Sequence, residues 1–280
     1  MENILEETKF IMKKYNIRAN KSLGQNFLIN EEVVKNIVEC GKIEKEDLVI
    51  EIGALTKYLL EKAGKVICIE LDTKMLQILE DRFSLYNNFE LINNDVLKVD
   101  LKNIIEKEKT EGKIKNVKIV ANLPYYITTP IIMKLLEEEL ELESITVMIQ
   151  KEVADRLIAT PGEKNTGAIT YSVYYYADSE AIMEVPNSSF IPEPEVTSKV
   201  IKLNIRKEPA VKPKDKEKMF KIIKYAFMQK RKTLLNSLTN NGVFKNKTQG
   251  TEILNSLGIK ENVRPEELTL EQFEKISNIL

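Results

Sequence analysis

Short apolar runs alternate with helical patterns through the first part of the chain. Five runs rich in aliphatic residues predict buried strands at residues 48–52, 65–70, 89–95, 117–122 and 145–150. Apolar residues at helical spacing predict helices at 55–62, 74–83, 130–140 and 151–158, and earlier at 6–15 and 31–40. Strands that alternate with helices are typical of a parallel sheet with helices on both faces.

The pattern changes after about residue 170. Residues 172–176, 181–185 and 196–205 predict antiparallel strands, and residues 208–214 have the composition of a linker. From Lys216 onward the chain predicts three or four short helices. We therefore predict an α/β fold with a Rossmann-like domain over residues 1–206, which includes an N-terminal arm, and a smaller all-helical domain over residues 207–280.

Composition excludes several kinds of chemistry. The 280 residues include 42 Lys and Arg against 43 Asp and Glu, which excludes a uniformly basic protein. Histidine is absent, so Ser-His-Asp catalysis, Cys-His catalysis and histidine metal sites are excluded. The two cysteines, Cys40 and Cys68, cannot form a multi-cysteine metal cluster and fit a reducing compartment. The chain contains no run of about 20 apolar residues, and its N-terminus is acidic, unlike a secretory signal. We therefore expect a cytoplasmic protein with no membrane segment and no metal.

Four residues mark the ends of successive predicted strands: Gly53, Glu70, Asp95 and Asn122. Ligands of open α/β sheets bind beyond the carboxyl ends of the strands. Singly, each residue is more often a turn residue or a helix cap. Their order along the chain, however, favours a cofactor that contains adenosine. Gly53 lets the backbone approach a ligand closely, Glu70 can accept hydrogen bonds from two ribose hydroxyls, and Asp95 can accept one from an adenine amine. The strand ends alone leave both NAD and S-adenosylmethionine open.

The segment Asn122-Leu123-Pro124-Tyr125-Tyr126 separates these two cofactors. It is similar to the motif of enzymes that methylate the exocyclic amines of bases. The lone pair of an adenine amine is delocalised into the ring, so acceptors aimed at its hydrogens favour a reactive, pyramidal nitrogen. The Asn122 side-chain oxygen and the Leu123 carbonyl are candidate acceptors, Pro124 fixes the carbonyl direction, and Tyr125 offers a stacking face. A plain strand-to-helix turn is the alternative interpretation, which the two aromatic residues disfavour.

A second aromatic residue, Phe190, begins the loop Phe-Ile-Pro-Glu-Pro-Glu-Val-Thr-Ser at residues 190–198. Alternate prolines hold such a loop extended. A base removed from its stack needs apolar faces to replace the stacking it has lost, a contact worth ~1–3 kcal/mol. Burial of Phe190 in the core under a surface connection is an equally good interpretation of this segment alone.

Seven segments in order resemble the ribosomal RNA small-subunit adenine dimethyltransferases (the KsgA/RsmA type). They are the segments at residues 21–28, 51–53, 69–72, 94–96, 122–126, 190–198 and 227–234. The resemblance covers nearly the whole chain and implies a class I methyltransferase sheet with S-adenosyl-L-methionine as cofactor. It also implies two methyl transfers to each of two adjacent adenosines near the 3′ end of 16S rRNA, with the 30S ribosomal subunit as partner, and we expect a monomer.

The resemblance also implies a role for each matching residue. The cofactor contacts are expected at Asn26, Leu28, Gly53, Glu70, Asp95 and Asn122. The residues expected to hold the reacting adenine are Asn122, Leu123, Pro124, Tyr125 and Phe190.

One departure from the family pattern concerns the cofactor loop. Members of the family continue from Glu-Ile-Gly into Pro-Gly-x-Gly, whereas here Gly53 is followed directly by Ala54 and Leu55. About four residues of the loop that passes under the methionine part of the cofactor are missing. Deliberate deletion, residues absent from the sequence as read, and natural variation are three open explanations. A true deletion predicts sharply weakened cofactor binding.

The near-zero net charge hides an asymmetry. Residues 199–250 contain 15 Lys and Arg and 3 Asp and Glu. A charge run is usually a solvated helix face, but the size of this excess favours contact with an RNA backbone. The candidate contacts are Lys221, Lys224, Lys230, Arg231 and Lys232.

Three alternatives to a small-subunit dimethyltransferase stay open or are disfavoured. One is a 23S rRNA adenine methyltransferase of the macrolide-resistance type, whose motif usually reads Asn-Ile-Pro-Tyr. Another is a small-subunit assembly factor that binds without methylating, which the Gly53-Ala54 junction suggests. A nicotinamide dehydrogenase is disfavoured, because no G-x-G-x-x-G follows the first strand.

Overall fold

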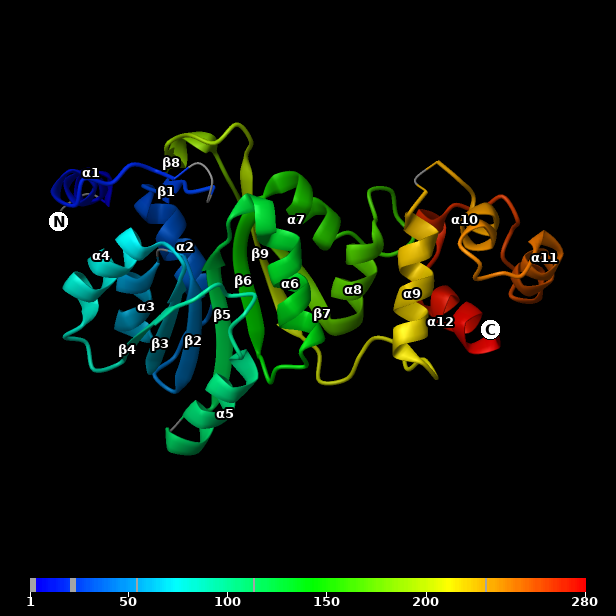
Figure 1. Cartoon of the computed structure of the whole chain (residues 1–280), viewed down its shortest axis with the longest axis horizontal. Helices are drawn as coiled ribbons and strands as arrows, with labels where there is room; N and C mark the ends of the chain where they lie inside the picture. Colours follow the sequence, from blue (N-terminus) through cyan, green and yellow to red (C-terminus); the bar gives the residue numbers. More distant parts are fainter. Residues whose placement is uncertain (1–3, 21–23, 54, 113, 230) are drawn as a thin grey trace. The chain divides into compact units, whose positions relative to one another are not determined.

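The computed structural model describes residues 4–20, 24–53, 55–112, 114–229 and 231–280 (Figure 1). The chain forms two compact units. The first consists of Met1–Ala154 and Glu180–Ile205, and the second of Asp155–Ser179 and Arg206–Leu280. The third passage of the chain between the units lies between Ile205 and Arg206, near the predicted boundary at residue 206, while Asp155–Ser179 adds an earlier segment to the second unit.

The first unit is built on a sheet that has seven strands in the described part of the chain, in the order β4-β3-β2-β5-β6-β9-β7. Strands β2 to β6 run parallel, and β9 pairs antiparallel to β6. The bounds are β2 Asp47–Ile52, β3 Lys65–Glu70, β4 Phe89–Asn93, β5 Asn116–Asn122, β6 Ser144–Gln150, β7 Ala177–Val185 and β9 Ser198–Ile205. The five predicted parallel strands and the Rossmann-like fold class are confirmed.

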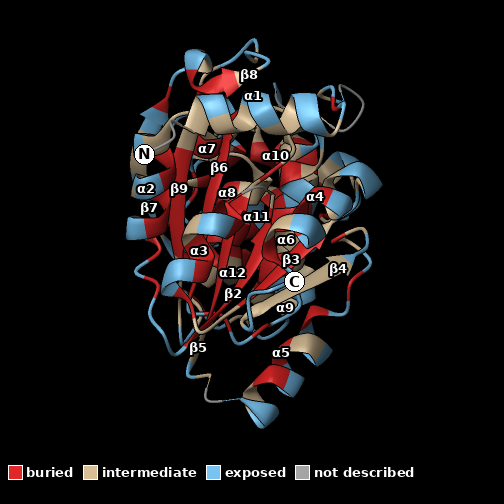
Figure 2. Ribbon diagram, turned by 90° about the vertical axis from the view of Figure 1, so that its left-hand side faces the viewer, coloured by how far each residue is buried: buried red, intermediate tan, exposed pale blue. Residues whose placement is uncertain are grey.

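Helices flank this sheet (Figure 1). They are α1 Ile4–Lys14, α2 Glu31–Cys40, α3 Thr56–Lys62, α4 Thr73–Phe83, α5 Leu101–Glu111, α6 Thr128–Glu137 and α7 Lys151–Leu157. The central strands β2, β5 and β6 are buried along almost their whole length (Figure 2). Strands covered on both faces are expected to be continuous apolar runs, which is why the sequence marked them clearly.

A small second sheet connects the N-terminal arm to the loop after β7. Strand β1 (Phe27–Leu28) pairs antiparallel with β8 (Phe190–Ile191), with Leu28 opposite Phe190. The Ile29 N–H extends the contact by donating to the Ser189 carbonyl at 2.8 Å. This pairing places the arm beside the aromatic loop.

The second unit is helical and corrects one prediction. Its helices are α8 Ala168–Tyr176, α9 Lys216–Phe227, α10 Leu234–Asn240, α11 Lys247–Ser256 and α12 Leu270–Ile279. The prediction of three or four short helices from Lys216 onward agrees with α9 to α12. Residues 172–176, however, were predicted as a strand and form the end of α8.

Tertiary packing explains this correction. The buried Tyr171 hydroxyl donates to the Leu268 carbonyl at 2.6 Å, and its ring meets Phe273 edge-on at 5.1 Å. The β-branched and aromatic residues of α8 thus fill a helical core, and this burial outweighs their local preference for a strand. Among the described residues, no helix is both long and apolar enough to cross a membrane.

Candidate functional site

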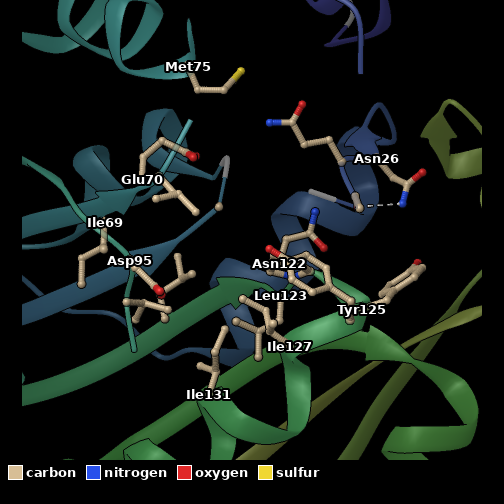
Figure 3. A pocket seen from close by; sticks show the side chains of 18 of the residues that line it. Asn26, Ile69, Glu70, Met75, Asp95, Asn122, Leu123, Tyr125, Ile127 and Ile131 are labelled. Atoms are coloured by element: carbon tan, nitrogen blue, oxygen red, sulfur yellow. Dashed lines mark hydrogen bonds between the residues drawn. The ribbon is translucent and has the colours of Figure 1, made fainter. Parts of the chain in front are cut away.

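A cavity opens at the carboxyl ends of β2, β3 and β5 and beside the segment after β4 (Figure 3). The strand register aligns these ends, because Ile52 pairs with both Ile69 and Ala121, and Glu70 pairs with Asn93. The cavity encloses about 950 Å³, including its open mouth.

The four residues predicted from the strand ends all line this one cavity. They are Gly53, Glu70, Asp95 and Asn122. The structure also brings to it Leu123, Pro124, Tyr125, Phe190 and Asn26. Leu28 is the exception among the predicted residues of this region, because its buried side chain lines a neighbouring cavity beneath α1.

Gly53 marks the closest approach between β2 and β5 at the cavity floor. Its φ is +115°, and a Cβ atom there would lie 3.0 Å from the Asn122 carbonyl oxygen. Only glycine adopts this conformation readily and leaves that space free. Ala54, the other side of the shortened junction, lies outside the described residues.

Beneath this turn lies a buried carboxylate, Glu51, to which the sequence analysis gave no role. It is fully buried in β2, and it accepts hydrogen bonds from the Leu55 N–H and, at 2.6 Å, from the Thr56 hydroxyl. Burial raises the pKa of Glu51 to about 7, although both hydrogen bonds act to lower it. Glu51 therefore ties the end of β2 to the first turn of α3. The sequence did carry a signal for this buried carboxylate, because Glu51 is the one charged residue in the apolar run at residues 48–52.

Glu70 and Asp95 stand on one side of the cavity (Figure 3). One oxygen of Glu70 accepts the Asp72 N–H at 2.7 Å, and burial raises the pKa of Glu70. Asp95 accepts the Leu97 N–H at 3.0 Å through Oδ1, so it also serves as a turn residue. A second backbone hydrogen bond, from Leu71, also acts on the Glu70 carboxylate and lowers its pKa, although burial outweighs both bonds.

The corner after β5 forms the opposite side of the cavity. The Leu123 N–H donates to the Met148 carbonyl at 3.2 Å, which holds the chain against β6. Tyr125 begins a short 3₁₀ helix, Tyr125–Ile127, and its hydroxyl lies 2.6 Å from the Ser198 Oγ. Burial raises the Tyr125 pKa, so the hydroxyl stays neutral. The ring of Tyr125 is thus held from both its backbone and its hydroxyl ends.

The arm closes the cavity from a third direction. Asn26 donates through Nδ2 to the Gly24 carbonyl at 3.2 Å (Figure 3). Gln25 donates to Asp72 Oδ2 at 2.7 Å, which links the arm to the turn after Glu70. Phe190, held by the β1–β8 pairing, is only 2% exposed yet lines the cavity. Both interpretations of Phe190, core residue and cavity wall, therefore hold.

The basic residues predicted from the charge asymmetry belong to the second unit. Lys221 and Lys224 are exposed on α9, and Arg231 and Lys232 are exposed between α9 and α10. The predicted Lys230 lies outside the described residues, as do Lys21, Ser22 and Leu23 of the arm motif. Within the described ranges, no group of three or more Cys, Asp or Glu side chains is placed to hold a metal ion.

The arrangement suits a nucleoside on one side of the cavity and a planar aromatic group on the other. Two carboxylates stand at adjacent strand ends, a side-chain-free glycine forms the floor, and an amide, a proline and two aromatic rings stand opposite. On a sheet of this topology, such a cradle defines the class as a Rossmann-like methyltransferase of nucleic-acid bases.

The comparisons with known proteins specify the family. A family model described as ribosomal RNA adenine dimethylase matches residues 16–280. The chain is 45% identical over 279 residues to the ribosomal RNA small subunit methyltransferase A of Alkaliphilus oremlandii, which covers 98% of this chain and 96% of that protein. It is 44% identical over 277 residues to the protein of the same name from Clostridioides difficile, with 98% and 94% covered.

Solved structures agree. A dimethyladenosine transferase from Plasmodium falciparum gives a TM-score of 0.71 at 27% identity and covers 89% of this chain and 95% of that one. The 23S rRNA methyltransferase ErmE gives 0.67 at 22% identity, a likeness that shows the fold alone. The chain thus belongs to the ribosomal RNA adenine dimethylase family. It is an rRNA adenine methyltransferase whose methyl donor is S-adenosylmethionine.

Proposed function

We propose that this protein dimethylates the exocyclic amines of two adjacent adenosines near the 3′ end of 16S rRNA in the 30S subunit, as a step in subunit biogenesis. One observation carries the proposal: Glu70 and Asp95 share a single cavity with Asn122, Tyr125 and Phe190. A nucleoside cofactor and a target base are thereby held side by side. The names of the bacterial relatives support the small subunit as the substrate. We propose that the protein acts as a monomer in the cytoplasm, where that substrate is assembled.

The cofactor is proposed to lie along the strand ends. Glu70 and Asp95 both line the cavity, and their carboxylates are acceptors suited to hydroxyl and amine hydrogens. We assign Glu70 to the ribose hydroxyls and Asp95 to the adenine amine. The backbone at Gly53, the arm residue Asn26 and Leu28 would flank the methionine part. When bound, S-adenosylmethionine supplies an electrophilic methyl group.

The target adenine is proposed to lie opposite, against the corner after β5. The Asn122 side-chain oxygen and the Leu123 carbonyl would accept the two amine hydrogens and favour a localised lone pair on nitrogen. Pro124, with φ −59°, fixes the Leu123 carbonyl direction. Tyr125, held by Ser198, and Phe190, held by Leu28, would replace the stacking that the base loses on eversion.

Transfer assays with tritiated S-adenosylmethionine test the substrate. We expect label in unmethylated 30S subunits and none in 50S subunits or free 23S rRNA. Label in the large subunit alone would contradict the proposal and favour the macrolide-resistance type of activity. Asn122→Ala is expected to abolish transfer while the protein keeps its unfolding temperature.

The shortened turn after Gly53 is proposed to weaken cofactor binding. Only two residues separate Gly53 from the start of α3 at Thr56. In addition, the Thr56 hydroxyl donates a hydrogen bond to Glu51, which holds the start of this helix close to β2. Calorimetry should show weaker S-adenosylmethionine binding in the wild-type chain than in a variant with Pro-Gly-Ala-Gly inserted between Gly53 and Ala54. Equal affinity in both chains would refute the proposed weakening.

A second candidate follows from the same turn: an assembly factor that binds immature small subunits without methylating them. The transfer assay separates the two functions. The assembly factor would be favoured if the wild-type chain binds 30S subunits but transfers no methyl group, while the variant with Pro-Gly-Ala-Gly inserted does transfer methyl groups.

We propose that a group of basic residues in the second unit contacts the RNA backbone. The residues are Lys221, Lys224, Lys230, Arg231 and Lys232. Each lost phosphate contact should reduce the slope of log affinity against log salt by roughly 0.7–0.9. Lys221→Gln combined with Lys224→Gln should therefore lower the slope by about 1.5, measured by filter binding. An unchanged slope would remove these residues from the RNA surface.

A further inference from the structure

Tyr126 differs sharply from its neighbour Tyr125, although both line the cavity. The Tyr125 hydroxyl is bonded to Ser198, and its ring is largely enclosed. Tyr126 is 55% exposed, which makes it one of the most exposed large side chains among the described residues of the first unit. An aromatic ring that is exposed at the mouth of a functional cavity offers a face on which a planar ligand can stack.

The local backbone holds the Tyr126 ring in this position. Tyr126 is the second residue of the 3₁₀ helix Tyr125–Ile127. Its ring lies beside Gly24, where a Cβ atom would be 3.5 Å from Tyr126 Cδ1. Gly24 has a φ of +59°, a conformation that favours glycine. The arm thus provides a backbone wall for one side of the ring.

Apart from its packing beside Gly24, Tyr126 has no polar or aromatic partner within the described ranges. Its hydroxyl makes no hydrogen bond, and its ring makes no aromatic or cation–π contact, with any residue that the structure describes. The exposed Tyr86 provides a contrast, because its ring packs edge-on against Phe83 at 6.0 Å. The surface of Tyr126 is therefore available for an external planar group.

We propose that Tyr126 is a stacking platform for the base next to the target adenosine. This inference rests on the proposed function, in which the target is one of two adjacent adenosines. When one base is everted into the cavity, its neighbour loses a stacking partner at the cavity mouth. An aromatic ring there restores that contact, and adenine offers a large face. Tyr126 thereby positions the RNA and does not touch the reacting amine.

The test uses the full chain and two synthetic RNA hairpins. One hairpin carries two adjacent adenosines in its loop. The other has an abasic site in place of one of them, so that the remaining adenosine is the target and lacks its neighbouring base. Fluorescence anisotropy gives the Kd for each RNA, and single-nucleotide mass spectrometry gives the methylation rate. The variants are Tyr126→Ala and Tyr126→Phe, and Tyr86→Ala is the matched control.

On the intact hairpin, Tyr126→Ala should raise the Kd and KM by roughly 5- to 150-fold, the range that loss of one base–aromatic stack implies. Its kcat, unfolding temperature and affinity for S-adenosylmethionine should stay unchanged. Tyr126→Phe and Tyr86→Ala should match the wild type. On the abasic hairpin, wild type and Tyr126→Ala should bind equally, because the base that stacks is absent.

Two results would overturn the inference. One is an unchanged Kd for Tyr126→Ala on the intact hairpin, and the other is a loss of equal size on the abasic hairpin. A wild-type chain that binds the hairpins but transfers no methyl group to unmethylated 30S subunits contradicts the proposed function, while the anisotropy series still decides the role of Tyr126.

Discussion

The buried Glu51 makes the stability of this protein depend on pH in a direction opposite to that of most carboxylates. The side chain is fully buried beneath the cofactor turn and bonds to Leu55 and Thr56. Burial raises its pKa in the folded protein to about 7, from 4.5 for an ordinary glutamate. Glu51→Gln removes the titration and keeps the shape, because an amide accepts from the Leu55 N–H and donates to the Thr56 hydroxyl.

The sign and size of the effect follow from linkage. Between pH 4.5 and pH 7 the unfolded chain releases the Glu51 proton while the folded chain retains it, so the free energy of unfolding falls as pH rises. The full difference between the two pKa values corresponds to roughly 3 kcal/mol. Most of it, roughly 2–3 kcal/mol, is lost between pH 5 and pH 8.

Urea unfolding at pH 5 and pH 8, followed by circular dichroism, measures this effect. Relative to Glu51→Gln, the wild type should lose roughly 2–3 kcal/mol of unfolding free energy between the two pH values. The titration of all other groups cancels in this comparison. Parallel pH profiles for the two proteins would refute the reasoning, because they would mean that Glu51 titrates alike in the folded and unfolded chains.

Three further substitutions test individual contacts. Glu70→Gln keeps an acceptor for the Asp72 N–H, and calorimetry should show a roughly 10- to 100-fold loss of S-adenosylmethionine affinity, since hydrogen bonds to charged groups contribute ~1.5–3 kcal/mol; unchanged affinity would exclude Glu70 from the ribose site. Gly53→Ala forces a φ of +115° on a side chain 3.0 Å from a β5 carbonyl and should cost about 1–3 kcal/mol in urea unfolding; a neutral result would contradict the close approach of β2 and β5. Lys118→Met leaves the fully buried carboxylate of Asp47 without the cation that lies 2.7 Å away, and it should lower the free energy of unfolding by about 3–5 kcal/mol. Lys115→Met, which breaks the exposed pair with Glu46, should lower it by less than ~1 kcal/mol. Equal losses in urea unfolding would contradict the larger effect expected from burial.

The strand ends were predictable because the parallel strands are buried on both faces. Their apolar runs end abruptly, so the polar residues that follow, such as Glu70 and Asn122, mark the same edge of the sheet. The order of strands along the chain then places those residues in one cavity. Motif resemblance added the family, which composition and periodicity alone did not specify.

Other features depend on contacts that no local pattern reveals. The β1–β8 ladder has two residues per strand, too short for any periodic signal, yet it sets Phe190 against the arm. Leu28 matches the family motif, but its side chain turns into the core and the neighbouring cavity. The run at residues 172–176 has strand composition and forms a helix because Tyr171 and Tyr175 pack into the helical core.

The claim that one cavity holds the cofactor beside an everted adenine is tested most directly at the modified atoms. Unmethylated 30S subunits would be incubated with the protein and S-adenosylmethionine carrying deuterated methyl groups, and the digested 16S rRNA would be analysed by mass spectrometry. We predict two labelled methyl groups on the exocyclic nitrogen of each of two adjacent adenosines, and none with Asn122→Ala. Label on a ring nitrogen, a ribose or another base, or equal labelling by Asn122→Ala, would contradict the account.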